Sequence, residues 1–125
     1  KYNSSSLSTE EMNLLFSKIE RLFNEEQIFL DSELKIDCIA EKLKVSTHRI
    51  SQTINTKGEM PFYDYVNSFR VSYLKQLLSQ ETKKKFTILA LGIEAGFNSK
   101  ATLNRVFKQH VGVTPKTFQK SQLTI

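Results

Sequence analysis

Residues 96–115 read GFNSKATLNRVFKQHVGVTP, and this stretch decides the fold that the sequence predicts. Gly96 suits a tight turn at the end of a helix, because glycine adopts positive φ angles without steric cost. Ser99 is a favourable N-cap, since its hydroxyl can accept a hydrogen bond from an N–H group of the first helical turn. Thr114-Pro115 has the form of another helix start, with Pro115 in the first helical position. The stretch therefore predicts a turn, a short helix and a second turn.

The helix predicted inside this stretch has two different faces. Leu103, Val106 and Phe107 recur at helical spacing and form an apolar stripe. The opposite face carries Lys100, Asn104, Arg105 and Lys108. From a helix in a DNA groove, such side chains can contact phosphates or hydrogen-bond to base edges. Residues 88–95 predict a short apolar helix capped by Thr87, and the pair has the pattern of a helix-turn-helix.

Charge is distributed unevenly along the 125 residues. Residues 1–35 contain four Lys and Arg against seven Asp and Glu, a net charge of −3. Residues 83–120 contain eight Lys and Arg against Glu94 alone, a net charge of +7. A segment this basic attracts polyanions, and neutralised phosphates are the main source of nucleic-acid affinity. The alternative interpretation is a solvated basic face without a partner.

The composition excludes several other classes. No run approaches the roughly 20 apolar residues of a membrane span, and the N-terminus has no signal peptide, so we expect a cytoplasmic domain. Cys38 is the single cysteine and lies in an apolar helical pattern, which favours a buried, inert thiol. His48 and His110 lack further metal ligands nearby in sequence. With no catalytic or phosphate-loop motif, we expect neither an enzyme nor a metal, and no cofactor.

The first part of the chain predicts an amphipathic helix. Ser8 and Glu11 have the spacing of a capping box, and apolar residues then recur at helical spacing to about residue 25. Residues 28–31 are expected to form a connector that packs onto the core of this helix. A second short helix, a turn at Val45 and a helix capped by Ser46 follow. Pro61 opens a long helix to about residue 80, whose inner face is predicted to contain Phe62, Tyr65, Val66, Phe69, Tyr73 and Leu77.

The two halves of the chain repeat one another. Five pairs of similar residues are 52 positions apart, and they are Ile36 and Ile88, Ile39 and Leu91, Ala40 and Gly92, Leu43 and Ala95, and Val45 and Phe97. Five further pairs are 53 positions apart, and they are Ser46 and Ser99, Ile50 and Leu103, Ile54 and Phe107, Phe62 and Pro115, and Tyr65 and Phe118. The repeat predicts two helix-turn-helix units in tandem with residues 61–80 between them. A helix of that length spans roughly 30 Å, close to the ~34 Å between successive major grooves.

These residues resemble the DNA-binding domain of AraC-type transcriptional regulators. The likeness covers about residues 34–120 and is strongest from Ile88 to Phe118, through Leu91-Gly92, Ala95-Gly96-Phe97, Leu103-Asn104-Arg105 and Thr114-Pro115. The first unit matches more loosely through Ile39-Ala40, Leu43, Val45-Ser46 and Tyr65-Val66-Asn67 to Arg70. The chain departs from the family pattern at Gly92 (usually Ala), Leu103 (commonly Phe or Tyr), Gln119 (often Arg) and Lys35 (often Ser or Thr).

The resemblance implies that the second helix of each unit enters the major groove of double-stranded DNA. The side chains that it places toward bases are His48, Ser51 and Gln52 in the first unit and Lys100, Ala101, Asn104 and Arg105 in the second. Phosphate contacts are expected from Ser46, Arg49, Asn55, Thr87, Ser99 and Lys108. For each position the alternative is a solvated surface residue. Contact with RNA polymerase is also implied.

The sequence thus predicts an all-α chain in four parts. They are a lead-in and amphipathic helix (1–30), a first helix-turn-helix unit (31–60), a connecting helix (61–80) and a second unit (81–125). The leading function is sequence-specific DNA binding by a bacterial transcription regulator. The alternative is a helical protein-interaction module with non-specific DNA anchoring. The absence of an initiator Met suggests a piece of a longer chain. Because the first 30 residues fall outside the family domain, we expect their helix to connect to an upstream sensor or dimerisation module, in a protein either soluble or membrane-tethered. No small-molecule ligand is expected in this fragment.

Overall fold

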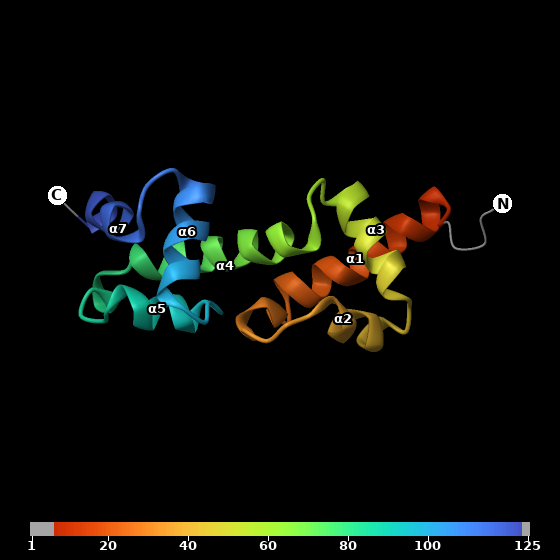
Figure 1. Cartoon of the computed structure of the whole chain (residues 1–125), viewed down its shortest axis with the longest axis horizontal. Coiled ribbons are helices and arrows are strands. Elements are labelled where there is room, and N and C mark those ends of the chain that lie inside the picture. The colour runs from red at the N-terminus through yellow and green to blue at the C-terminus, as the bar shows by residue number, and fades with distance from the viewer. Residues whose placement is uncertain (1–6, 124–125) are drawn as a thin grey trace. The chain divides into compact units, whose positions relative to one another are not determined.

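A computed structural model describes residues 7–123, and every regular element in that range is helical (Figure 1). The elements are α1 (Thr9–Asn24), η1 (Ile28–Leu30), α2 (Ile36–Leu43), α3 (Thr47–Lys57), α4 (Phe62–Leu78), η2 (Glu81–Lys83), α5 (Ile88–Glu94), α6 (Lys100–Val111) and α7 (Pro115–Leu123), where η marks a 3-10 helix. The predicted fold class is confirmed: two helix-turn-helix pairs, a linking helix and an additional N-terminal helix.

Polar caps set the starts of five helices, as the sequence predicts. At α1 the Ser8 hydroxyl accepts from the Glu11 N–H at 3.1 Å, and the Glu11 carboxylate accepts from the Ser8 N–H at 3.0 Å. The hydrogen bond from the Ser8 N–H to the carboxylate lowers the pKa of Glu11, and the side chain of Ser8 adds to this effect. The other four side-chain caps are Ser46, Thr87, Ser99 and Thr114. In contrast, α2 begins after Lys35 without a side-chain hydrogen bond at its cap.

The internal repeat is confirmed by where the helices begin. Helices α2 and α5 begin at Ile36 and Ile88, an offset of 52. Helices α3 and α6 begin at Thr47 and Lys100, an offset of 53. Helices α4 and α7, at Phe62 and Pro115, keep the offset of 53. Each copy of the repeat therefore has three helices. The first copy is α2, α3 and α4, and the second copy is α5, α6 and α7.

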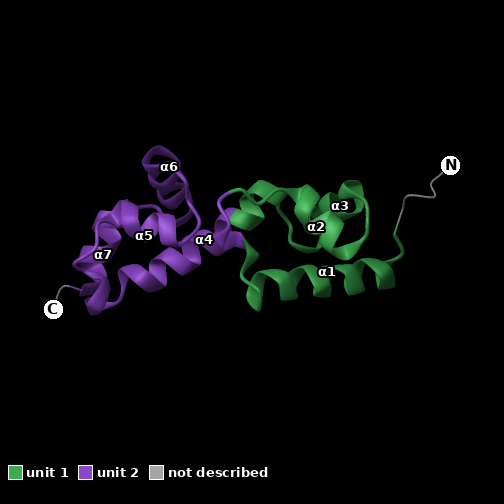
Figure 2. Cartoon of the chain, turned by 90° about the horizontal axis from the view of Figure 1, so that it is seen from below, with its two compact units in different colours: residues 1–28, 33–66 green, residues 29–32, 67–125 purple. Residues whose placement is uncertain are grey.

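The chain divides into two compact units (Figure 2). Among the described residues, unit 1 contains 7–28 together with Glu33–Val66, and unit 2 contains Phe29–Ser32 together with 67–123. Helix α4 contributes to both. It has 17 residues and is roughly 25 Å long, so it is shorter than the predicted 61–80. The placement of Phe29–Ser32 in unit 2 was not expected from the sequence.

The core of unit 1 lies where α1, α2 and α3 meet. Ile19, Ile39, Ile50 and Ile54 are fully buried there. The ring of Tyr65, from the start of α4, packs edge-on against Phe23 with their centroids 4.9 Å apart. Removal from water raises the pKa of Tyr65 to about 12, with a smaller contribution from the charge of Glu20. Cys38 is only half-buried, so its predicted burial is partial.

The core of unit 2 is built by α4, α5 and α6. Its fully buried members include Leu74, Leu78, Leu91, Leu103 and Phe107. The partly buried ring of Phe118 in α7 packs edge-on against Phe107 at 5.7 Å between centroids. Val71, Leu74 and Leu78 were absent from the predicted inner face of α4.

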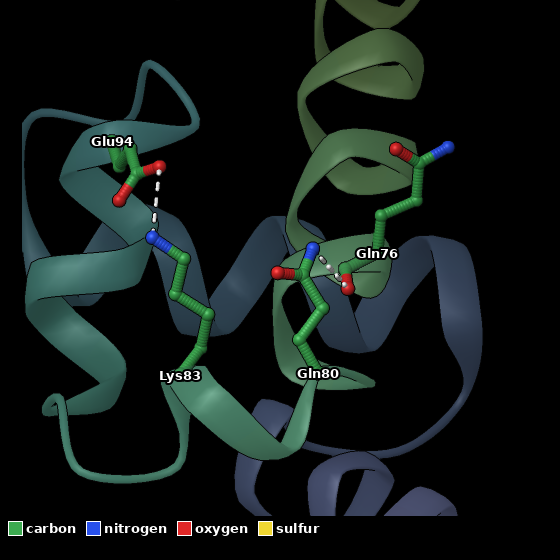
Figure 3. A network of polar contacts seen from close by, with 4 residues as sticks. All are labelled: Gln76, Gln80, Lys83 and Glu94. Atoms are coloured by element: carbon green, nitrogen blue, oxygen red, sulfur yellow. Dashed lines mark hydrogen bonds and ion pairs between the residues drawn. The ribbon is translucent and has the colours of Figure 1, made fainter.

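The segment between α4 and α5 is locally ordered. It contains the 3-10 helix η2, and the side chain of Lys83 reaches Glu94 of α5 with 3.9 Å between Nζ and Oε2 (Figure 3). The Gln80 amide donates to the carbonyl oxygen of Gln76 at 3.2 Å. Part of the basic charge of residues 83–85 is therefore neutralised within the unit.

Candidate nucleic-acid interface

Helix α6 separates its polar residues from its apolar ones almost completely. Leu103, Val106 and Phe107 are at most 1% exposed. The remaining face carries the predicted residues Lys100, Ala101, Asn104, Arg105 and Lys108, all exposed. At 100° per residue these five positions fall within about 140° of one another. The structure therefore brings the predicted contact residues of the second unit onto one solvent-facing surface.

A groove of about 770 Å³ runs beside this face of α6. Its floor includes Leu103 and Pro115, and its rim carries four cationic side chains, which are Lys100, Arg105, Lys108 and Lys116. None of the described residues that line it is acidic. A concave surface with cations and no carboxylates concentrates positive potential, which favours an anionic partner.

Two helix N-termini border the same groove. Thr87 caps α5 by accepting from the Ala90 N–H at 3.0 Å, and Thr114 caps α7 by accepting from the Thr117 N–H at 3.2 Å. Helix N-termini present N–H groups and positive partial charge to anions. Thr87 is among the contacts predicted from the sequence, whereas Thr114 and Lys116 are not. The Thr114-Pro115 cap was the available signal for them.

Ser99, the third predicted contact at a helix start, faces partly inward. Its hydroxyl accepts from the Thr102 N–H at 3.2 Å and donates to the Thr102 hydroxyl at 3.0 Å. The Ser99 hydroxyl is therefore already used in closing the first turn of α6. Only the adjacent N–H groups remain as the means by which this helix start could contact a phosphate.

In unit 1, α3 presents a smaller polar face. His48, Ser51, Gln52 and Asn55 have the spacing i, i+3, i+4, i+7 of one helical face. His48 and Asn55 are exposed, whereas Ser51 and Gln52 are half-buried. Asn55 donates from Nδ2 to the carbonyl oxygen of Ser51 at 2.9 Å. The Oε1 atom of Gln52 is buried and has no hydrogen-bond partner among the described residues.

Arg49 lies a quarter turn away from this face of α3. It lines a shallow groove of about 170 Å³ with residues of α1, among them Glu11 and Lys18, and its charge contributes to the lowered pKa of Glu11. Ser46 is exposed, and its hydroxyl accepts from the Arg49 N–H at 3.2 Å. Of the residues predicted in unit 1, Arg49 is the one that the structure separates from the others.

Residues 39–121 match a protein family described as "Helix-turn-helix domain". Two curated relatives are also similar to this chain. They are the melibiose operon regulatory protein of Escherichia coli K12, 26% identical over 90 residues, and a probable transcription factor, PqrA, of Proteus vulgaris, 29% identical over 97 residues. The chain belongs to the AraC-type helix-turn-helix family.

The extent of the match differs between the relatives of this AraC-type domain. The aligned part covers 72% of this chain but 29% of the melibiose regulator, and 78% of this chain with 77% of PqrA. The chain thus spans less than a third of the length of the melibiose regulator.

Solved structures share the fold of this AraC-type domain. The C-terminal domain of AraT, a response regulator from Geobacillus stearothermophilus, superposes with a TM-score of 0.73 at 22% identity, covering 97% of this chain and 92% of that one. A transcriptional regulator from Chromobacterium violaceum with an AraC-type DNA-binding domain superposes with a TM-score of 0.70 at 20% identity, covering 87% of this chain and 97% of that one.

Within residues 7–123, no group of three or more His, Cys, Asp or Glu side chains could hold a metal ion. In the same range, no helix is both long and apolar enough to cross a membrane.

Proposed function

We propose that this AraC-type domain binds double-stranded DNA sequence-specifically as part of a bacterial transcription regulator. In this proposal α3 and α6 each read a segment of major groove, and the two segments lie about one helical turn apart on the DNA. The observation that carries the proposal is the face of α6, on which Lys100, Asn104, Arg105 and Lys108 are exposed beside a cationic groove. A helix of this kind fits the major groove.

In the second unit, Arg105 and Asn104 are the proposed base readers. A guanidinium can donate two hydrogen bonds to O6 and N7 of guanine, and an amide can pair with N6 and N7 of adenine. Lys100, in the first turn of α6, can also donate to guanine, but from an ammonium group that lacks the planar fork of a guanidinium. Ala101 has only a methyl group, so its contact would be with the methyl group of a thymine.

In the first unit, Gln52 is the proposed principal reader. Its buried Oε1 atom lacks a partner among the described residues, and a glutamine that rotates outward can pair with both N6 and N7 of adenine. His48 and Ser51 lie on the same face and can hydrogen-bond to neighbouring base edges. The smaller number of charges on α3 implies that this unit contributes less affinity than unit 2.

Phosphate contacts would fix the position of each helix on the DNA. We assign Lys108 and the N-termini at Ser46, Thr87 and Ser99 to this role, together with Arg49 and Asn55. To reach a phosphate, the Arg49 side chain would first have to turn away from α1. The Asn55 side chain would have to give up its hydrogen bond to the Ser51 carbonyl oxygen. Thr114 and Lys116 line the same groove as Thr87 and Lys108, and they extend the proposed phosphate surface.

In the cell, the domain would act in the cytoplasm and would depend on other modules. We propose an upstream sensor or dimerisation module and contact with RNA polymerase as its protein partners. The competing function is a protein-interaction module that is anchored non-specifically to DNA, for which the exposed apolar side chains Leu14 and Ile93 offer surface.

The salt dependence of DNA binding tests the phosphate contacts of this proposal, which non-specific anchoring would share. Sequence reading itself is tested by selecting bound duplexes from a random pool. Fluorescence anisotropy with a labelled random-sequence duplex gives the slope of log affinity against log salt concentration. Lys108→Ala should reduce that slope by about 1, because one phosphate contact is lost. Lys84→Ala is the matched control, since Lys84 pairs with Glu81 outside the groove. Equal changes for the two variants, or no binding by the parent, would overturn the proposal.

A further inference from the structure

The segment Phe29–Ser32, which precedes the first helix-turn-helix in sequence, is held within unit 2 by Arg70. The Arg70 side chain donates from Nε to the carbonyl oxygen of Phe29 at 2.7 Å and from Nη2 to the carbonyl oxygen of Asp31 at 2.9 Å. These are charge-assisted hydrogen bonds, and one planar guanidinium reaches two successive parts of the segment. Arg70 therefore ties residues about 40 positions upstream to α4.

The same segment lies directly against the turn that precedes α6. Gly96 has φ +105°, and a Cβ atom there would collide with the carbonyl oxygen of Phe29. That atom would also lie 2.9 Å from Nε of Arg70 and 3.2 Å from Cα of Leu30. Glycine is needed at this position both for its backbone conformation and for the close approach of the segment.

Apolar contacts hold the segment on its other side. The Phe29 side chain is 4% exposed, and its ring centroid lies 5.7 Å from that of Phe69 and 5.9 Å from that of Tyr73. The turn itself is tied back to α5, because the N–H groups of Gly96 and Phe97 donate to Ile93 and Gly92 at 3.0 Å. The segment and the turn therefore form one packed assembly.

We propose that Phe29–Ser32 is a brace that positions α6 for base reading, and that Arg70 is the positioning residue that holds the brace. This role of the brace rests on the proposed function, in which α6 reads DNA. The turn at Gly96 fixes the direction in which α6 leaves α5, and a reading helix must be held to a fraction of an ångström by its supporting residues. Sequence preference in the second unit thus depends on a segment outside its own helix-turn-helix.

Arg70→Lys tests the brace while keeping the positive charge. A lysine cannot donate to both carbonyl groups from a planar fork. Amide hydrogen exchange at Gly96 and Phe97 should become faster by about tenfold, and the preference for bases read by α6 should fall about tenfold. The preference for bases read by α3 and the salt slope should not change. Lys75→Arg on the same helix is the control and should alter none of these quantities.

Two results would overturn the brace: unchanged exchange at Gly96 and Phe97, or an equal loss of preference at both DNA segments. If Arg70→Lys does not fold, Phe29→Leu removes the ring contacts while leaving the Phe29 carbonyl in place, and the same expectations apply. If the parent chain selects no DNA sequence, the proposed function fails. The exchange measurement still decides in that case whether Arg70 and Phe29 hold the turn.

Discussion

Leu103 occupies the space that a methyl group on Gly92 would need. A Cβ atom at Gly92 would lie 2.6 Å from Cδ2 of Leu103 and 3.2 Å from Cδ1, and Leu103 is fully buried. These are two of the positions at which the sequence departs from the family pattern, and they meet where α5 packs on α6. The glycine, which weakens α5 by up to about 1 kcal/mol relative to alanine, makes room for the side chain of Leu103.

Gly92→Ala is therefore expected to destabilise the domain despite its better helix propensity. Overpacking costs typically 1–3 kcal/mol, so the net loss in the free energy of unfolding should be about 1 kcal/mol. Urea unfolding of Gly92→Ala, Leu103→Val and the double variant measures the coupling between the two sites. We expect the double variant to be more stable than the sum of the single changes predicts, by about 1 kcal/mol. Additive effects, or a stabilising Gly92→Ala, would show that the side chain of Leu103 can move aside at little energetic cost.

Tyr65 should make unit 1 sensitive to alkaline pH. Its pKa is raised to about 12 in the folded state, while the unfolded chain releases the same proton near pH 10. The folded state thus binds more protons between these values, and stability falls as pH rises through that window, by up to about 2 kcal/mol. Below pH 10 both states are protonated and the effect is absent.

The substitution Tyr65→Phe should remove this part of the pH dependence. Ultraviolet titration of the phenolate, with unfolding followed at pH 9 to 12, measures both quantities. Tyr63→Phe is the matched control, because Tyr63 is 52% exposed. An identical titration curve for the parent and Tyr65→Phe at the alkaline end would contradict the burial argument.

The cap of α1 is expected to contribute measurably to stability. Ser8→Ala removes the hydroxyl that accepts from Glu11 and should lower the free energy of unfolding by about 1 kcal/mol. Since the pKa of Glu11 is lowered in the folded state, the stabilisation by this carboxylate is present above its unfolded pKa and disappears as pH falls. Ser8→Ala should therefore also reduce the loss of stability on acidification. Ser17→Ala, at an exposed position within α1, is the control. Equal effects of the two changes would show that the capping box contributes nothing.

Arg105→Lys separates base reading from charge. Lysine keeps the positive charge but loses the two-point contact with guanine. The salt slope of DNA binding should stay the same, and discrimination against a changed base pair should fall about tenfold, since a good bidentate pair is worth about 1–3 kcal/mol. Lys108→Arg, at a position proposed to contact phosphate, should leave discrimination unaltered. Unchanged discrimination would reassign Arg105 to the phosphate backbone, where lysine supplies the same charge.

Local chemistry explains why much of this fold could be predicted. Ser46, Thr87 and Ser99 each start a helix because the hydrogen bond that makes a cap involves residues only three apart. The apolar stripe of α6 follows from helical spacing in the same way, and it fixes which face remains exposed. The cap sets where α6 begins and the apolar stripe sets which face is buried. Together they place the candidate residues of the second unit on one exposed face.

The features that the sequence analysis missed depend on contacts between distant residues. Phe29 belongs to unit 2 because Arg70 binds its carbonyl oxygen, and no local pattern encodes that pairing. The inner face of α4 was incomplete because its first turns pack in one unit and Leu74 and Leu78 in the other. A single stripe cannot describe a helix with two cores. Arg49 was assigned from its position in α3, whereas its surroundings include Glu11 of α1.

Selection of bound duplexes from a random pool tests the central claim most directly, with Arg105→Ala and Gln52→Ala measured beside the parent. The account predicts two enriched blocks about 10 base pairs apart, of which Arg105→Ala relaxes one and Gln52→Ala the other. If no sequence is enriched and binding only fades with salt, α3 and α6 do not read bases, and the cationic groove is a non-specific anchor.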